Sequence, residues 1–188
     1  MLTRRYAYRG AALRCLVFLQ FSFSPMVLAD VADDRDCPRA EAQGADGMRI
    51  EFRQYQFPDG SADLVLSLHA GNGMDIKRVT YGGAKTEGCH YKSVAIAPGG
   101  SENQWGWHLA WAGDQGIRYA RMDGHAWVSS PPKRLSTANA SEVQLQVNGS
   151  ELRLMWREQQ GDRTETYQAV SHDEGRSWES PQLLHPAD

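Results

Sequence analysis

The alternation of apolar and polar residues, broken at short intervals by turn residues, is the feature of this sequence that most restricts its fold. From Met48 onward no stretch repeats its apolar residues with the period of a helix. Short alternating runs are separated instead by Gly, Asn, Asp and Pro, which is typical of strands joined by tight turns. The sequence therefore predicts an all-β domain over residues 48–188.

The clearest run is SEVQLQVNGSELRLMW, residues 141–156, in which apolar residues take alternate positions on both sides of Asn148-Gly149. Asn-Gly supplies the positive φ angles of a two-residue turn, so this stretch predicts a β-hairpin. The same alternation and flanking turn residues predict earlier strands at residues 49–56, 63–69, 76–81 and 91–97.

The first 29 residues have the layout of a secretory signal peptide, with a basic start, a short apolar middle and a small-residue end. The alternative is a membrane anchor, which requires about 20 apolar residues. The apolar run here is shorter and is broken by Gln20 and Pro25. We therefore expect a periplasmic or secreted protein, released from the membrane when the signal is cleaved.

The charge of the exported chain limits its partners. The signal segment carries four of the 20 basic residues and none of the 23 acidic ones, so the remaining 159 residues have a net charge of −7. Binding to phosphates requires a basic surface. Nucleic acid and anionic membranes are therefore not expected as partners.

Two cysteines, Cys37 and Cys89, remain after cleavage, because Cys15 belongs to the signal segment. An even pair in an oxidising compartment predicts a disulfide. The alternative, a thiol or metal-binding pair, lacks the C-x-x-C spacing of such sites. The bridge would tie residues 30–47, a polar stretch predicted to be an irregular lead-in, onto the domain.

An internal repeat relates residues 107–135 to residues 152–184. In each unit a strand ends in Trp, a strand with Tyr follows, and an Asp and Gly turn leads to a second Trp. The corresponding pairs are Trp111 and Trp156, Tyr119 and Tyr167, and Trp127 and Trp178, separated by 45, 48 and 51 residues. A period near 50 residues with several strands per unit is typical of propeller blades.

The turn of the second unit, SHDEGRSW, resembles the Asp-box, or BNR repeat, of sialidases and other β-propellers. The residues that carry the resemblance are Ser171, Asp173, Gly175 and Trp178. The stretch ARMDGHAW resembles a degenerate copy that contributes Asp123, Gly124 and Trp127. In that family the box shapes a turn between outer strands, away from the ligand, so the resemblance implies structural roles for these residues.

The elementary chemistry of these residue types agrees with that role. A short Asp side chain can accept hydrogen bonds from its own turn, Gly takes a positive φ, and Trp covers the base of the hairpin. With the strands of residues 49–81 added, the chain has material for about three propeller-like blades, whereas closed propellers typically have about four to eight. We expect a partial propeller or a compact sandwich-like variant, either as a monomer or as a homodimer that completes the ring.

The resemblance also raises the possibility of a sialidase-like glycoside hydrolase. Such enzymes bind the substrate carboxylate with three arginines and carry an Arg-Ile-Pro motif, whereas here Arg49-Ile50 is followed by Glu51. Because no arginine trio can be assigned, we predict no catalytic residue. The preferred hypothesis is an exported non-catalytic binding or assembly module for a protein or glycan, without a cofactor.

Candidate ligand-contact residues lie in the run WGWHLAW, where aromatic side chains share one face of a predicted strand. The candidate contacts are Trp105 and Trp107 on that face, together with the adjacent His108. The alternative is that these residues belong to the core. A periplasmic metal-binding protein is a further alternative, with donors at His69, Met74, Cys89, His90, His108, His125, His172 and His185. No two histidines are spaced i, i+2 on one strand face, so no metal site is predicted.

Overall fold

The structure of the protein is a computed structural model that describes residues 37–44, 47–70, 73–80, 84–85, 88–99, 106–122 and 129–184. The chain divides into two units, Met1–Asp33 and Asp34–Asp188, and all of the described residues belong to the second. The predicted signal peptide therefore lies outside the described residues. All regular elements within the described ranges are β-strands, which confirms the predicted all-β class.

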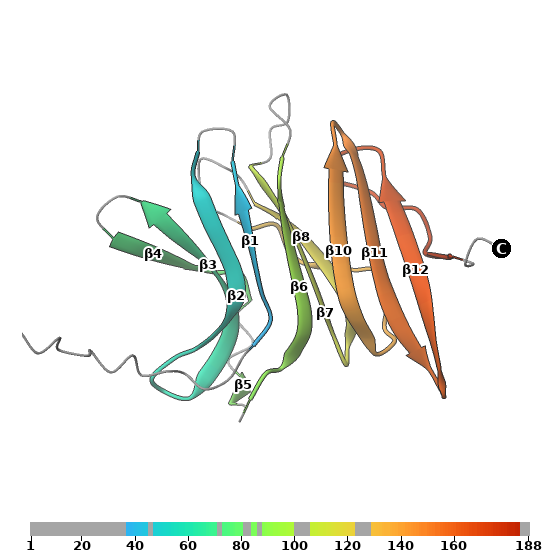
Figure 1. The fold of residues 1–188 in the computed structure, drawn as a ribbon, viewed down its shortest axis with the longest axis horizontal. Coiled ribbons are helices and arrows are strands. Elements are labelled where there is room, and N and C mark those ends of the chain that lie inside the picture. The colour runs from blue at the N-terminus through green and yellow to red at the C-terminus, as the bar shows by residue number, and fades with distance from the viewer. Residues whose placement is uncertain are drawn as a thin grey trace, which may run out of the picture. The chain divides into compact units, whose positions relative to one another are not determined.

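These strands form three antiparallel sheets (Figure 1). The first sheet has the order β1-β2-β3-β4, with β5 paired to β3; the middle sheet is β6-β7-β8-β9, and the third is β10-β11-β12-β13. The strand bounds are β1 Arg39–Gln43, β2 Arg49–Gln56, β3 Ser61–Ala70, β4 Gly73–Arg78, β5 Ala84–Lys85, β6 Tyr91–Pro98, β7 Trp107–Gly113, β8 Gly116–Met122, β9 Lys133–Arg134, β10 Ala140–Asn148, β11 Glu151–Gln160, β12 Arg163–Ser171 and β13 Gln182–Leu183.

Most strands lie where the sequence pattern placed them. The predicted hairpin is formed by β10 and β11, with Asn148 paired to Glu151 and Gly149 at a φ of 58°. The prediction of an irregular lead-in over residues 30–47 is wrong for Arg39–Gln43, because this segment forms strand β1. That strand lacks large apolar residues, but Ala40 and Ala42 point toward the core while the charged side chains between them suit an edge strand.

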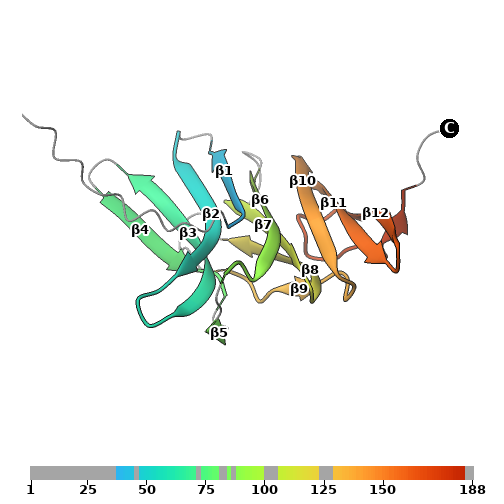
Figure 2. The ribbon, with the colours of Figure 1, turned by 60° about the horizontal axis from the view of Figure 1, so that its bottom comes forward.

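The middle sheet is covered on both faces, which explains why β7 is buried along its whole length (Figure 2). Trp107, Leu109 and Trp111 pack with apolar residues of the first sheet. The alternate residues Ala110 and Ala112 pack with apolar residues of the third sheet. One strand thus supplies both cores, because successive side chains of a strand point to opposite faces.

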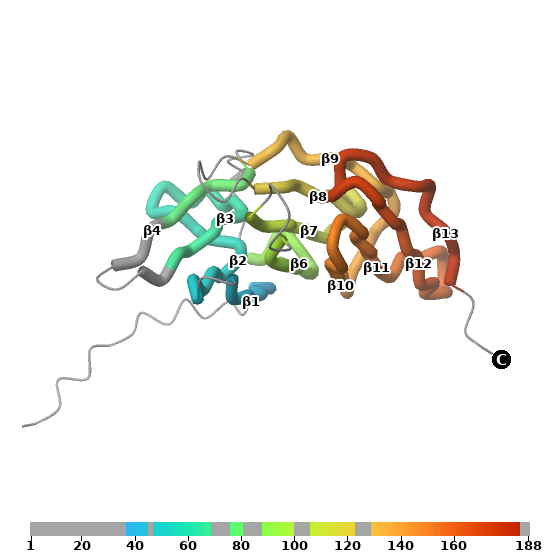
Figure 3. Tube along the Cα trace, turned by 90° about the horizontal axis from the view of Figure 1, so that it is seen from above, coloured from blue at the N-terminus to red at the C-terminus, as the bar shows by residue number. Residues whose placement is uncertain are grey.

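The strands that begin the three sheets are neighbours, since β6 contacts both β1 and β10 (Figure 3). The other strands of each sheet follow in chain order, except that β5 pairs with β3. Antiparallel sheets of about four strands arranged in this way are the blades of a propeller. No strand of one sheet pairs with a strand of another within the described residues, so the three sheets are blade-like but do not close into a barrel.

The outer face of the third sheet is polar. Leu154 and Trp156 of β11 pack against the middle sheet and Leu152 is buried on the same face, while on the other face Arg153 and Arg157 are exposed and Met155 is half-buried. Three of the four cross-strand neighbours of these arginines on this outer face are polar: Gln146 and Val170 lie beside Arg153, and Ser141 and Thr166 lie beside Arg157. A charged and amide-bearing face can remain in water, so it requires no further sheet to cover it.

The outer face of the first sheet is covered in a different way. Val65 on this face is fully buried, although it lies on the side of β3 away from the middle sheet. Its two direct cross-strand neighbours are Arg53 and Arg78. The long aliphatic stems of arginine can cover an apolar residue while the charged ends stay in water. The same two guanidinium groups lie over the rings of Tyr55 and Phe57.

In the two repeat units of the sequence, the first tryptophans occupy equivalent places in the structure, but the tyrosines do not. Trp111 and Trp156 each point toward the preceding sheet. Tyr167 is paired directly with Trp156 and shares its face, whereas Trp111 is paired with Arg118, so Tyr119 points to the opposite face. The cause is the odd difference of three residues between the two spacings, since a shift by an odd number turns a side chain to the other face.

Candidate functional site

The turn over residues 171–178, here called the Ser171 turn, is held by its own side chains. Asp173 Oδ1 accepts hydrogen bonds from the Ser171 hydroxyl and from the backbone N–H of Ser177, both 2.8 Å, and Oδ2 accepts one from the Ser177 hydroxyl at 2.6 Å. The Gly175 N–H donates to Ser171 Oγ at 2.8 Å. Burial raises the pKa of Asp173, but the hydrogen bonds from Ser177 and Ser171 outweigh it and lower this pKa to about 2.

The Ser171 turn lies against the middle sheet. Gly175 has a φ of 76°, and a Cβ atom there would overlap the hydroxyl group of Tyr119. The ring of Trp178 meets the ring of Tyr119 edge to face, with centroids 4.8 Å apart. The ammonium group of Lys133 donates a hydrogen bond to the carbonyl of Arg176. The turn is therefore a contact between two sheets, in which Gly175 and Trp178 meet Tyr119.

Trp107 and His108, two of the predicted ligand-contact residues, are buried, with 4% and 0% of their surface exposed. Trp107 belongs to the core shared with the first sheet, and His108 Nδ1 lies 2.6 Å from the Tyr119 hydroxyl on the other face. Neither side chain offers a surface to a ligand. Four other predicted residues lie outside the described residues: Trp105, Asp123, Gly124 and Trp127.

Burial governs the protonation of the His108 and Tyr119 pair. Desolvation lowers the pKa of His108 to about 4, and the nearby Arg121 acts in the same direction. Desolvation also raises the pKa of Tyr119 far above its usual range. Both groups are therefore neutral near neutral pH, and their hydrogen bond connects β7 and β8 behind the Ser171 turn.

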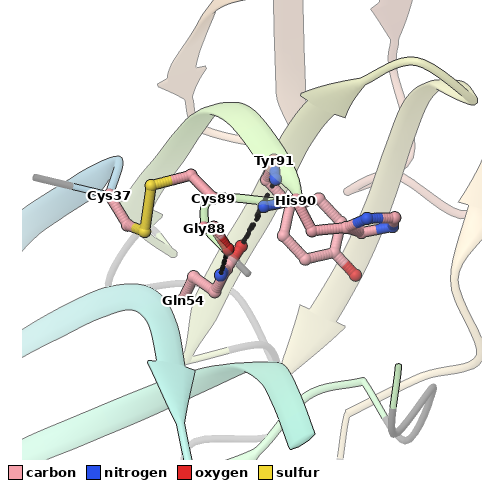
Figure 4. Close-up of a disulfide and its surroundings, with 6 residues drawn as sticks. All are labelled: Cys37, Gln54, Gly88, Cys89, His90 and Tyr91. Atoms are coloured by element: carbon pink, nitrogen blue, oxygen red, sulfur yellow. Dashed lines mark hydrogen bonds between the residues drawn. A yellow bond between two sulfur atoms is a disulfide. The ribbon is translucent and has the colours of Figure 1, made fainter. Parts of the chain in front are cut away.

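Cys37 and Cys89 form the predicted disulfide, with their Cα atoms 5.3 Å apart and a sequence separation of 52 (Figure 4). Cys37 precedes β1 of the first sheet, and Cys89 precedes β6 of the middle sheet. On the chain-entropy model, closing a loop of this length stabilises the fold by about 4 kcal/mol. The bond links the first two sheets next to His90 and Tyr91.

A cleft of about 590 Å³ lies between the final turn of the first sheet and the end of the middle sheet. Its volume is within the range of small-ligand sites, roughly 300–1,000 Å³. Segments far apart in the sequence contribute its lining: Val79, Thr80, His90, Tyr91, Trp111, Gly113, Asp114, Gln115, Gly116, Arg118 and Pro132. No short motif could have brought these residues together.

The inner part of the cleft is apolar. Val79 and Trp111 line it and are almost fully buried, at 3% and 2% exposure. Tyr91 is half-buried beside them, and burial raises the pKa of its hydroxyl, with a smaller contribution from the carboxylate of Asp63. A hydrogen bond with Thr80 and the charge of Arg118 oppose this shift only in part. Tyr91 therefore remains a protonated phenol that can donate or accept a hydrogen bond.

The rim of the cleft carries polar groups that are already oriented. Lys92 Nζ lies 2.6 Å from Asp114 Oδ1 and donates a hydrogen bond of 2.6 Å to Asn139 Oδ1. A hydrogen bond from Lys92, then its charge, lower the pKa of Asp114, so this carboxylate is ionised. Arg118 donates to the Gln115 amide oxygen at 3.1 Å, which leaves other N–H groups of its guanidinium available.

Near neutral pH the lowered pKa of Asp114 leaves a carboxylate that accepts hydrogen bonds, and the raised pKa of Tyr91 leaves a protonated phenol. The cleft can therefore offer hydrogen bonds and an aromatic surface. Sequence reasoning missed it, and the one local signal was the turn Gly113-Asp114-Gln115-Gly116, which places polar residues at its rim.

Two further features bear on the alternatives. Across the described ranges, no helix has the length and apolarity needed to cross a membrane. In the same ranges, no group of three or more His, Cys, Asp or Glu side chains is placed to hold a metal ion. Four of the donors considered earlier have side chains outside the described set: His69, Met74, His125 and His185.

The fold and the cleft together define an all-β protein of three blade-like antiparallel sheets that are not closed into a barrel. No protein-family model, no curated protein and no solved structure matches the chain.

Proposed function

We propose that this chain is an exported, non-catalytic binding module of the Asp-box type, and that its cleft holds a short saccharide. The observation that carries the proposal is the cleft, in which the half-buried Tyr91 lies beside Gln115 and Arg118. Aromatic rings offer apolar faces of negative potential to the C–H groups of a sugar ring. Amide and guanidinium groups match its hydroxyl groups in hydrogen bonding.

The dimensions of the cleft favour a saccharide over a protein ligand. A stable protein partner usually covers about 800 Å² of each surface. A cleft of about 590 Å³ instead suits a compact ligand that enters it. Export is supported by the basic and apolar start of the sequence and by the disulfide, since such bonds persist in oxidising compartments.

A sialidase-like hydrolase is the alternative that this proposal displaces. Most glycosidases place two carboxylates across the scissile bond, and sialidases use a tyrosine nucleophile. Among the described residues that line the cleft, Asp114 is the one carboxylate, and it is ionised and paired with Lys92. The raised pKa of Tyr91 also argues against a nucleophilic phenolate.

The test is calorimetric titration of the purified chain with a panel of neutral di- to tetrasaccharides. We expect Tyr91→Ala and Arg118→Ala each to weaken binding roughly tenfold or more, as for residues at the centre of a contact. Arg157→Ala, on the exposed outer face of the third sheet, is the matched control and should leave the Kd unchanged. An unchanged Kd in both cleft variants would disprove the site, and release of reducing sugar from the panel would disprove the absence of catalysis.

A further inference from the structure

One wall of the cleft depends on a short segment whose backbone is held from outside its own sheet. Residues 88–91 lead into β6 of the middle sheet, and His90 and Tyr91 at the end of this segment line the cleft. The two rings meet edge to face, with centroids 4.9 Å apart. The position of this segment therefore decides where both side chains stand.

The first attachment of this segment is the side chain of Gln54, from β2 of the first sheet (Figure 4). Its Oε1 accepts hydrogen bonds from the backbone N–H groups of His90 at 2.7 Å and Tyr91 at 3.3 Å. Its Nε2 donates to the carbonyl of Gly88 at 3.0 Å. One buried amide, 7% exposed, thus holds three backbone groups of a segment more than thirty positions away.

The second attachment is the disulfide, which joins Cys89 of the same segment to Cys37 at the start of the first sheet. Both attachments therefore come from the first sheet and end within residues 88–91 (Figure 4). Cys89 is exposed, so a thiol reagent can reach this bond. The amide bonds and the covalent bond act on neighbouring residues of one wall.

We infer that Gln54 and the Cys37–Cys89 disulfide form a two-part tether that positions the His90 and Tyr91 wall, so that the cleft reaches its binding geometry only in the oxidised protein. For the effect on ligand binding, the inference rests on the proposed function. Gln54 acts as a positioning residue, because its hydrogen bonds go to the backbone of the wall and not into the cleft. The chemistry of the switch is thiol–disulfide exchange.

The exchange needs a dithiol reductant as co-reactant. A thiolate of the dithiol attacks one sulfur of the bridge and forms a mixed disulfide, and the second thiol then displaces the protein. Two electrons and two protons pass to Cys37 and Cys89, which become thiols, while the dithiol becomes a cyclic disulfide. Afterwards the Gln54 amide is the attachment that still binds the backbone of residues 88–91 to the first sheet.

The test measures backbone ¹⁵N order parameters of the full exported chain, before and after reduction with dithiothreitol. We expect values of about 0.85 at His90 and Tyr91 in the oxidised protein and below about 0.6 after reduction. Gln54→Met, which keeps the volume and removes the three hydrogen bonds, should lower these values without a reductant. Gln56→Met on the same strand is the matched control and should leave them unchanged, as should Leu154 and Ala169 of the third sheet in every sample.

A second measurement separates the tether from the proposed function. The saccharide panel is titrated before reduction, after reduction and after reoxidation, and we expect a roughly tenfold loss of affinity that reoxidation restores. Unchanged order parameters at residues 90 and 91 in both the reduced protein and Gln54→Met would overturn the tether. A loosened wall with unchanged saccharide affinity would keep the tether and overturn the assignment of the cleft as the ligand site. Loosening that extends equally to the third sheet would mean general destabilisation and would also overturn the inference.

Discussion

The middle sheet is packed on both faces, but its two interfaces are closed by different means. Toward the first sheet it presents bulky side chains such as Trp111, which meets Phe52 edge to face at 6.2 Å, and the contact is fastened by a disulfide beside an open cleft. Toward the third sheet it presents Ala110 and Ala112, and the contact is fastened by the Ser171 turn against Tyr119.

The difference shows what each kind of fastening requires. Hydrogen bonds and ring contacts act only at close range, so the Ser171 turn holds its interface by filling it. A covalent bond keeps its strength whether or not the space beside it is filled. The covalently fastened interface is therefore the one that can contain a cleft without losing its attachment.

The largest effect on this comparison should come from removing the covalent fastening. The double substitution Cys37→Ser and Cys89→Ser should lower the free energy of unfolding by about 4 kcal/mol, because the unfolded chain regains the freedom of a long loop. Denaturant unfolding of the oxidised wild type and the double variant measures this. The wild type under reducing conditions is the control and should behave like the variant. Equal stability of oxidised and reduced wild type would contradict the expectation.

A somewhat smaller effect is expected at the non-covalent fastening. Gly175→Ala introduces a Cβ that overlaps the Tyr119 hydroxyl, at a positive φ that alanine rarely adopts. The expected loss is about 3 kcal/mol, of which roughly 1 kcal/mol is the backbone cost. Gly161→Ala isolates that backbone cost, because Gly161 also has a positive φ, of 61°, with nothing near its missing Cβ. If both variants lose the same stability, the contact with Tyr119 carries no weight.

The third prediction concerns pH and touches only the interface with the third sheet. The pKa of His108 is about 4 in the folded chain and about 6.5 when unfolded, so the unfolded state binds more protons between these values. Stability should therefore fall as the pH is lowered from 6.5 to 4, by at most about 3 kcal/mol. Asp173 adds a separate loss at lower pH, between about 3.8 and 2, because its folded pKa is depressed.

Unfolding followed by denaturant titration at several pH values measures this dependence. His108→Gln, which can keep a hydrogen bond to Tyr119 but does not titrate in this range, should remove the part of the dependence between pH 6.5 and 4. The loss below pH 3.8 should remain in that variant, since it belongs to carboxylates whose pKa is lowered, Asp173 among them. A pH profile identical to that of the wild type would show that His108 does not carry the effect.

Much of the fold could be predicted from the sequence, because it follows from local patterns. Alternation and the Asn148-Gly149 turn identified the hairpin of β10 and β11, and counting cysteines identified the Cys37–Cys89 bond. Strand β1 was missed because alanines between charged residues give almost no hydrophobic signal. The short strands β5, β9 and β13 were also missed, since two residues carry no period.

The candidate site could not be predicted in the same way. Tyr91, Asp114 and Arg118 belong to different strands and turns, and only the packing of the first sheet against the middle sheet brings Thr80 to them. The aromatic run around Trp107 was predicted to contact a ligand because its tryptophans are conspicuous in the sequence. It is conspicuous because β7 is covered on both faces, and that same cover removes it from contact with solvent.

The polar outer face of the third sheet has a consequence for how such a chain can grow. A duplicated blade appended after residue 184 would meet Arg153, Arg157 and Gln146 where the middle sheet meets alanines and leucines. Arg153 and Arg157 are already paired with Glu151 and Glu142, and an apolar blade that covered these exposed ion pairs would remove water from all four charges without replacing it. A sheet added on this face would therefore need polar side chains of its own to meet it.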